Sequence, residues 1–303
     1  MDTRKILDLA EEYNDAIATL EQKAISRLVK SIESSYRQLS KEFHKKYPKL
    51  KKASNILPAQ RLQLIQGELG DLLQVVKPQD KESAIESLTG MITEADRLGA
   101  EETAEIVKAI DPDFKALSFS RVPITAAAIA ADQSYQRLLG GGTAFAERAS
   151  IIISEGMIQG LGNQRVAAAL KKSLEITRRQ AERIARTESA NAAIGAAKVA
   201  YASSDIEYGI WLTLRQDVCA WCVAKSGKIY KITSMVIPQH FNCRCSIMPV
   251  TPEWVRNGLI DFDAIDTYSE ALAVREGRKQ RTDLAPFEVK VPREVSRERL
   301  AKL

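Results

Sequence analysis

The sequence predicts a mainly α-helical protein with a small α+β module towards its C-terminal end. Three observations lead to this prediction. A long apolar stripe follows helical spacing, proline and glycine are sparse, and a short stretch of alternating residues surrounds a cluster of cysteines. The chain has only 10 Pro and 15 Gly among 303 residues, a content that favours long helices over many short strands.

The composition is that of a folded, soluble chain. Hydrophobic residues make up 45% and charged residues 27%, a balance typical of globular proteins. The net charge of +5 is a mild basic excess, which does not by itself indicate nucleic-acid binding. Every apolar run is far shorter than the roughly 18 residues that a membrane span needs, and charged residues open the N-terminus. We therefore expect no membrane segment, no signal peptide, and a protein made in the cytoplasm.

Residues 1–139 are predicted to form a helical N-terminal region. Apolar residues recur at steps of three or four from Ile6 to Tyr47 with no Pro or Gly between them, as on one face of a single long helix. We expect Pro48 to end this helix. A stripe of this length needs a partner, which can be later helices of a bundle, another protein, or a second copy of the chain. Further helices are predicted at residues 58–78, 80–98, 100–110 and 124–139.

Glycines at residues 140–142 predict a hinge, and we place a domain boundary there. The next domain is expected to cover residues 143–250. Its helices are predicted at residues 143–159, 163–173 and 176–203, and its strands at residues 210–214, 227–230 and 245–250. Towards the end the chain is rich in charge and has little periodicity, so residues 251–303 are expected to form an extended arm that orders only against a neighbour.

All 4 cysteines of the chain lie between positions 219 and 245, together with one of its 2 histidines. A Cys-x-x-Cys turn brings two thiolates about 3.5–4 Å apart, which suits a tetrahedral ion with Zn–S bonds of about 2.3 Å. We predict one structural zinc ion, which would hold together a zinc-knuckle-like unit of three strands that is too small to have a core of its own. Five candidate ligands compete for four positions: Cys219, Cys222 and His240, with either Cys243 or Cys245 as the fourth.

Two alternatives remain open for these thiols. They could form disulfides, or only pack, if the mature protein is exposed to an oxidising environment. A redox-active Cys-x-x-Cys is disfavoured, because no βαβ pattern surrounds it.

Other residues near the cluster are predicted to support it. Arg186 and Glu188 lie two apart on a helix and point to different sides, so they could anchor the knuckle through buried ion pairs or backbone hydrogen bonds. Trp211 and Trp221 are expected to pack around the metal site. Arg244 should face away from the neighbouring cysteines, towards a carboxylate such as Glu188.

These segments also resemble a known family. The resemblance is carried, in order, by Arg186-Thr187-Glu188, Trp211, Cys219-Ala220-Trp221-Cys222, Gly227 to Tyr230, Pro238-Gln239-His240, Cys243-Arg244-Cys245 and Pro249-Val250. Their order and spacing are similar to those of the C-terminal domain of phage Mu F-like minor head proteins, the phage head morphogenesis family. The resemblance covers residues 143–250. Gln239 and Phe241 depart from the family's pattern, which often has small residues or proline beside the histidine.

The resemblance implies a minor structural protein of a tailed-phage head, which associates with the portal vertex or the capsid interior and assists head assembly or DNA delivery. The implied partners are the portal protein, the major capsid protein and packaged DNA. The implied location is the virion head, and the bacterial host cytoplasm during assembly. The resemblance implies no catalysis, so the chain is not expected to be an enzyme.

Two other functions remain open. A DNA-binding packaging factor would use the basic residues between positions 23 and 52 and the C-terminal arm, and its binding would weaken with salt. A zinc-dependent, treble-clef-like nuclease would use His240 and Asn242. No set of Asp, Glu and His that could hold a catalytic Mg²⁺ lies beside these two residues in the sequence.

Overall fold

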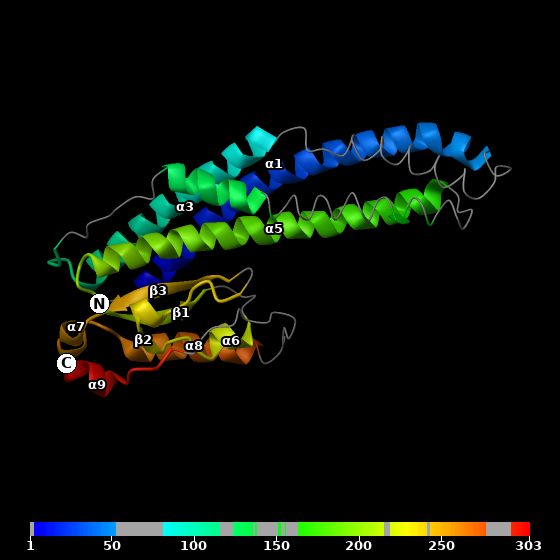
Figure 1. The fold of residues 1–303 in the computed structure, drawn as a ribbon. Helices are drawn as coiled ribbons and strands as arrows, with labels where there is room; N and C mark the ends of the chain where they lie inside the picture. The colour runs from blue at the N-terminus through cyan, green and yellow to red at the C-terminus, as the bar shows by residue number, and fades with distance from the viewer. Residues whose placement is uncertain are drawn as a thin grey trace. The chain divides into compact units, whose positions relative to one another are not determined.

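The fold is described by a computed structural model that covers residues 3–52, 81–115, 124–135, 137, 151–152, 155, 163–214, 219–240, 243–276 and 292–303. The chain divides into two compact units. Unit 1 contains residues 1–22, 90–127 and 186–303, and unit 2 contains residues 23–89 and 128–185. Most described residues are helical, and a small antiparallel sheet lies in unit 1 (Figure 1). The predicted fold class, mainly α with a small α+β module, is confirmed.

The predicted long N-terminal helix is confirmed as α1 (Thr3–Lys52), which has 50 residues. The prediction that Pro48 ends this helix is wrong, because the helix continues to Lys52. Proline removes one backbone donor and crowds the preceding turn. Close to the C-terminal end of a helix few further hydrogen bonds depend on that turn, so the helix tolerates it.

Two pairs of predicted helices are each one continuous helix, so the predicted breaks are wrong. The helices predicted at residues 80–98 and 100–110 correspond to α3 (Lys81–Ile110), and those predicted at residues 163–173 and 176–203 correspond to α5 (Asn163–Ala202). Gly99 serves close packing instead of ending α3, because a Cβ at Gly99 would lie only 2.3 Å from the backbone oxygen of Ala193 in α5. The stretch between residues 173 and 176 contains no Pro or Gly that would end a helix.

Several predicted elements lie outside the described residues. These are the helix at residues 58–78, most of the helix at residues 143–159, and the glycine hinge at residues 140–142. Residues 124–135 are helical, as predicted. Unit 2 is helical throughout its described residues, and it buries apolar side chains such as Ile25, Leu88 and Val166.

The sheet of unit 1 has three antiparallel strands in the order β2-β1-β3. They are β1 (Tyr208–Thr213), β2 (Ile229–Lys231) and β3 (Cys245–Val250), and they correspond to the three predicted strands. The central strand β1 is buried at every position, so both of its faces are covered. In Figure 1 the sheet lies between the parts of α1, α3 and α5 that belong to unit 1 and a second layer that contains α6 (Ala220–Val223) and α8 (Phe262–Glu276).

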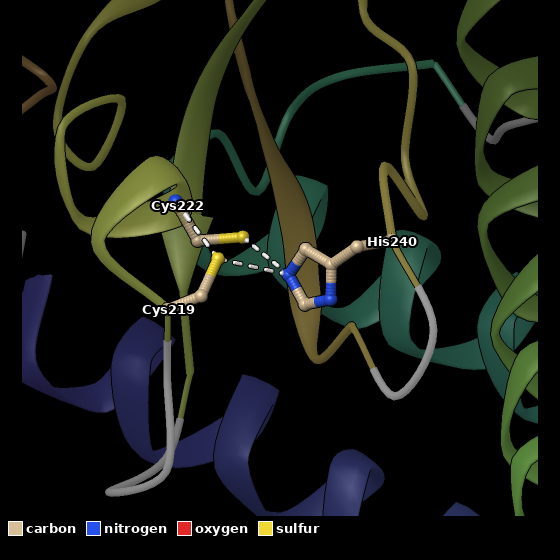
Figure 2. Close-up of side chains that lie close together, drawn as sticks. All are labelled: Cys219, Cys222 and His240. Carbon is tan, nitrogen blue, oxygen red and sulfur yellow. Dashed lines mark hydrogen bonds between the residues drawn. The ribbon is translucent and has the colours of Figure 1, made fainter. Parts of the chain in front are cut away.

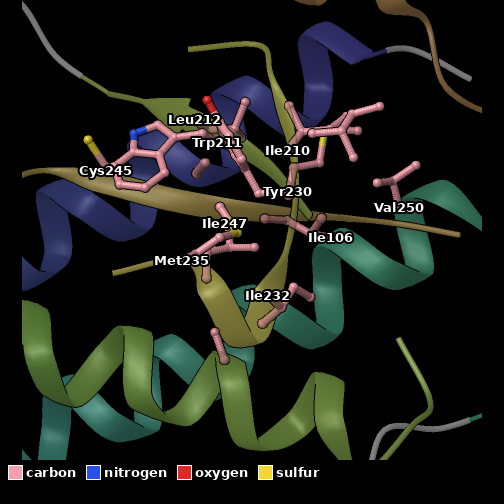
Figure 3. Packing of buried hydrophobic residues seen from close by; sticks show 14 of the residues in the cluster. Ile106, Ile210, Trp211, Leu212, Tyr230, Ile232, Met235, Cys245, Ile247 and Val250 are labelled. Carbon is pink, nitrogen blue, oxygen red and sulfur yellow. The ribbon is translucent and has the colours of Figure 1, made fainter. Parts of the chain in front are cut away.

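The core of unit 1 draws on both ends of the chain. Ile106 of α3 packs in one buried cluster with Ile210 and Trp211 of β1 (Figure 3). The same cluster contains Ile6 of α1 and Leu300 near the C-terminus. All four cysteines belong to this cluster as well. The strands around the cysteines are therefore part of a core that is much larger than the knuckle itself.

Residues 251–303, which are expected to form an extended arm, contain three helices in their described part. These are α7 (Pro252–Arg256), α8 and α9 (Arg297–Ala301). The Ser296 side chain caps the start of α9 by accepting a backbone hydrogen bond. Val295 forms an isolated β-bridge with Ile229 of β2, and Leu300 is fully buried. The described end of the chain therefore packs within its own unit.

Candidate metal centre

The Cys-x-x-Cys segment forms the first turn of α6. Cys219 is the N-cap residue, with extended backbone, and its Sγ accepts a hydrogen bond from the backbone N–H of Cys222. This turn makes the two thiols point in the same direction, towards His240 (Figure 2). Both cysteines are buried, so the turn presents two sulfur donors to the interior of unit 1.

His240 and Cys243 approach this turn from the segment that precedes β3. The Nε2 atom of His240 lies 3.0 Å from the Sγ of Cys219 and 3.1 Å from the Sγ of Cys222 (Figure 2). The Sγ of Cys243 lies 3.9 Å from the Sγ of Cys222. Cys219, Cys222 and His240 thus form one buried group of donors, and Cys243 adjoins it through Cys222.

Cys245, the fifth candidate, takes part in a second group. Its Sγ lies with those of Cys222 and Cys243 in a group whose ligand atoms are all within 4.8 Å of one another. Its Sγ also lies 3.8 Å from the Oγ1 of Thr213, at the end of β1. The ring of Trp211 lies beside Cys245 (Figure 3). Burial raises the pKa of the Cys245 thiol, and the interaction with Trp211 offsets only part of this rise.

The donor separations can be compared with those of a tetrahedral zinc site. Zn–S bonds of about 2.3 Å and Zn–N bonds of about 2.0–2.1 Å place sulfur and nitrogen about 3.6 Å apart, and two sulfurs about 3.8 Å apart. The Cys222–Cys243 separation of 3.9 Å agrees with the second value, and the two separations of 3.0 and 3.1 Å between His240 and the cysteines are shorter than the first. Sulfur and imidazole donors are those that zinc prefers, so the residues fit the predicted ion.

Hydrogen bonds within the cluster separate the thiols into two kinds. The Cys222 thiol lowers the pKa of Cys219 to about 5 and lowers the pKa of Cys243 well below its usual value. The pKa of Cys222 itself is raised, chiefly by its hydrogen bond to Cys219, and burial raises the pKa of Cys245. Thiolates, the form that binds metals, are therefore favoured at Cys219 and Cys243.

Gln239 supports the cluster although sequence reasoning did not single it out as a functional residue. Its Nε2–H donates to the Sγ of Cys222 at 3.3 Å, and its Oε1 accepts from the ammonium group of Lys225. Lys225 in turn lies over the ring of Trp211, 4.9 Å from the centroid. Donors around a ligand sulfur orient it and stabilise its negative charge. The only signal in the sequence is the position of Gln239 directly before His240.

Arg244, between two of the cysteines, forms an ion pair with Glu21 of α1. The Nη1 of Arg244 lies 2.6 Å from Oε1 of Glu21, and its Nη2 donates to Oε2. Ser189 of α5 also donates to Oε1 of Glu21, and the same hydroxyl contacts the backbone oxygen of Arg186. The predicted anchor residues Arg186 and Glu188 both lie on α5 just before Ser189, and Glu188 is itself buried.

Glu21 was missed by sequence reasoning, but a signal for it exists. It lies four residues after Ile17 and three before Ala24, both of which are buried, so an acid stands on the apolar stripe of α1. Charged residues are almost never fully buried unless they are paired. An acid in such a stripe therefore predicts a buried partner, although it does not say which one.

The two tryptophans near the cluster differ. Trp211 is 1% exposed and packs in the core, in an edge-to-face contact with Tyr230, as predicted. Trp221 is 54% exposed, so the prediction that it packs around the metal site is wrong. Both lie near cysteines in the sequence. Only Trp211 stands on a buried strand, whereas Trp221 lies on the outer side of the single turn α6.

Another buried acid, Glu102 of α3, accepts a hydrogen bond of 2.9 Å from Ser246, the residue after Cys245. Burial raises its pKa from 4.5 to about 7. The protonated carboxyl therefore stabilises the fold fully below about pH 4.5, and this contribution is lost as the pH rises through about 7.

We expect Glu102→Gln to remove this pH dependence. At pH 8 the variant should be more stable than the unmodified protein by on the order of 3 kcal/mol, and at pH 5 the two should be similar. Urea unfolding at each pH gives the free energy of unfolding of both proteins. Because both contain the same thiols, any effect of pH on the thiols cancels in the difference between the two proteins. Parallel pH profiles for the two proteins would show that Glu102 is not the group responsible.

The geometry defines a class of protein: a long-helix protein whose C-terminal part carries a buried Cys/His knuckle suited to a metal ion. Residues 151–248 match the family described as Phage Mu protein F like protein, which confirms the predicted resemblance. No curated protein and no solved structure matches the chain. Among the residues that the structure describes, no helix has the length and apolar character needed to cross a membrane.

Proposed function

We propose that the chain is a minor structural protein of a tailed-phage head, which associates with the portal vertex or the capsid interior and assists head assembly or DNA delivery. The observation that carries this proposal is the family match over residues 151–248, which contains α5 and all five candidate ligands. Its partners would be the portal protein and the major capsid protein, and its location the virion head. No catalytic role is part of the proposal.

We further propose that one zinc ion is held by Cys219, Cys222, His240 and Cys243. Cys243 is preferred over Cys245 because its Sγ lies 3.9 Å from that of Cys222, whereas the Sγ of Cys245 also contacts Thr213. A site with four protein ligands is closed, as in structural zinc sites, and the bound ion would cross-link the turn at α6 to the segment before β3. Arg186 and Glu188 would support this arrangement from α5.

The proposal is tested on phage particles and with purified proteins. We expect the chain to be present in purified heads, and heads made without it to be defective in assembly or in DNA delivery. The purified chain should bind its phage's portal protein at high as well as low salt. Normal, infectious particles that lack the chain would contradict the proposal. Binding to DNA that weakens steeply with salt would favour the packaging factor, and metal-dependent DNA cleavage would favour the nuclease.

A further inference from the structure

Helix α1 holds Arg244 at two points. The Glu21 carboxylate binds the guanidinium with both of its oxygens, and the Asn14 side chain donates to the backbone oxygen of Arg244 at 3.4 Å. Asn14 and Glu21 are seven residues apart, so they lie on the same face of α1, two turns from each other. Both the side chain and the main chain of Arg244 are therefore held by the same helix face.

This contact is buried and matched in charge. The Glu21 side chain is 1% exposed and that of Arg244 is 13% exposed. A buried carboxylate is tolerated where several donors satisfy it, and here two guanidinium N–H groups and the Ser189 hydroxyl do so. Removal of one partner would leave the other charged and unpaired in the interior. A state in which the ion pair is broken but both side chains stay buried is therefore much less stable than the state with the pair formed.

Arg244 lies between Cys243 and Cys245, and its backbone sets the directions of both side chains. We propose that Glu21 and Arg244 are positioning residues of the metal site, so that metal binding and the docking of residues 3–22 of α1 onto the knuckle stabilise each other. This inference rests on the metal site of the proposed function. The coupling is reciprocal: whatever α1 adds to metal affinity, the metal adds to the docking of α1.

The test compares metal affinities by chelator competition in the full chain. We expect Glu21→Gln to weaken zinc binding by about tenfold or more, as changes of residues that support metal ligands do. The visible spectrum of the cobalt-substituted variant should change, because Cys243 is no longer held in place. Asp266→Asn is the matched control, since it breaks an ion pair with Arg297 in the same unit without touching the knuckle, and its zinc affinity should stay unchanged.

A double variant separates positioning from stability. Glu21→Met with Arg244→Met leaves no unpaired charge, so the fold should be retained, but zinc affinity should remain about tenfold weaker because the hold on Arg244 is lost. In hydrogen exchange, removal of zinc should speed exchange in residues 3–22 of the unmodified protein and have little further effect in the double variant.

The possible failures are distinguishable. If the unmodified chain binds no zinc, the metal site of the proposed function fails and this inference fails with it. If the unmodified chain binds zinc and the double variant binds it equally well, the metal site stands and the coupling through Glu21 and Arg244 is overturned. The coupling is also overturned if removal of zinc leaves exchange in residues 3–22 unchanged.

Discussion

Replacement of Cys222 by serine is expected to abolish zinc binding and to lower the free energy of unfolding of unit 1 by on the order of 5 kcal/mol. Structural zinc supplies about 10–16 kcal/mol of apparent binding free energy in small zinc domains, and the large core here should retain part of the fold without it. Cys222 is the residue to change because it belongs to both candidate ligand groups. Elemental analysis and thermal unfolding with and without a chelator measure the two effects.

Cys243→Ser and Cys245→Ser form a matched pair of controls. Both cysteines are buried and they stand on either side of Arg244, so the two changes are chemically alike. With Cys243 as the fourth ligand, Cys243→Ser should behave like Cys222→Ser, whereas Cys245→Ser should keep the metal. Loss of the metal only in Cys245→Ser would show that Cys245, and not Cys243, is the fourth ligand. No bound metal in the unmodified chain would contradict the zinc site altogether.

Replacement of Gly99 by alanine is expected to destabilise unit 1 by about 3 kcal/mol or more, although alanine is the better helix former by about 1 kcal/mol. The added Cβ would lie 2.3 Å from the backbone oxygen and 2.6 Å from the Cα of Ala193, so α3 and α5 would have to separate. Backbone atoms of a helix cannot move aside as a flexible side chain can. Urea unfolding followed by circular dichroism measures the loss.

Gly195→Ala is the control for this prediction. Gly195 lies within α5, and a Cβ there would meet no atom within 4 Å. The change should therefore raise stability by about 0.5–1 kcal/mol, because alanine loses less backbone entropy on folding. If the two alanine variants had similar stabilities, the close approach of α3 and α5 at Gly99 would not be a constraint on the fold.

Periodicity predicted the helices and strands of this chain better than it predicted where they end. The apolar stripe from Ile6 gave one long helix, and β3 was predicted at its observed bounds. The predicted helix ends relied on proline and glycine as helix-breaking residues, and this rule failed at Pro48 and Gly99. A helix end is a balance between local propensity and tertiary packing, and the contact of Gly99 with Ala193 is not visible in the sequence around either residue.

The ligands of the candidate metal site were predictable because ligand spacing is a local property. Cys219 and Cys222 lie in one turn, and His240 and Cys243 in one short segment, so few arrangements bring them together. The residues that support the ligands are placed by tertiary packing and not by local spacing. Glu21 meets Arg244 only because α1 packs beside the knuckle, across most of the length of the chain, and no spacing rule covers such a distance.

The core of unit 1 also constrains how the protein is made. Ile6 of α1 is buried in the same cluster as Leu300, so the ribosome releases the first helix long before its final partners are synthesised. Until the residues as far as Leu300 have been synthesised, part of the apolar face of that helix lacks its final partners and is open to transient contacts or chaperones. Native pairing of such distant segments is intrinsically slow, so a chain cut short by premature termination would expose this face and be prone to aggregation.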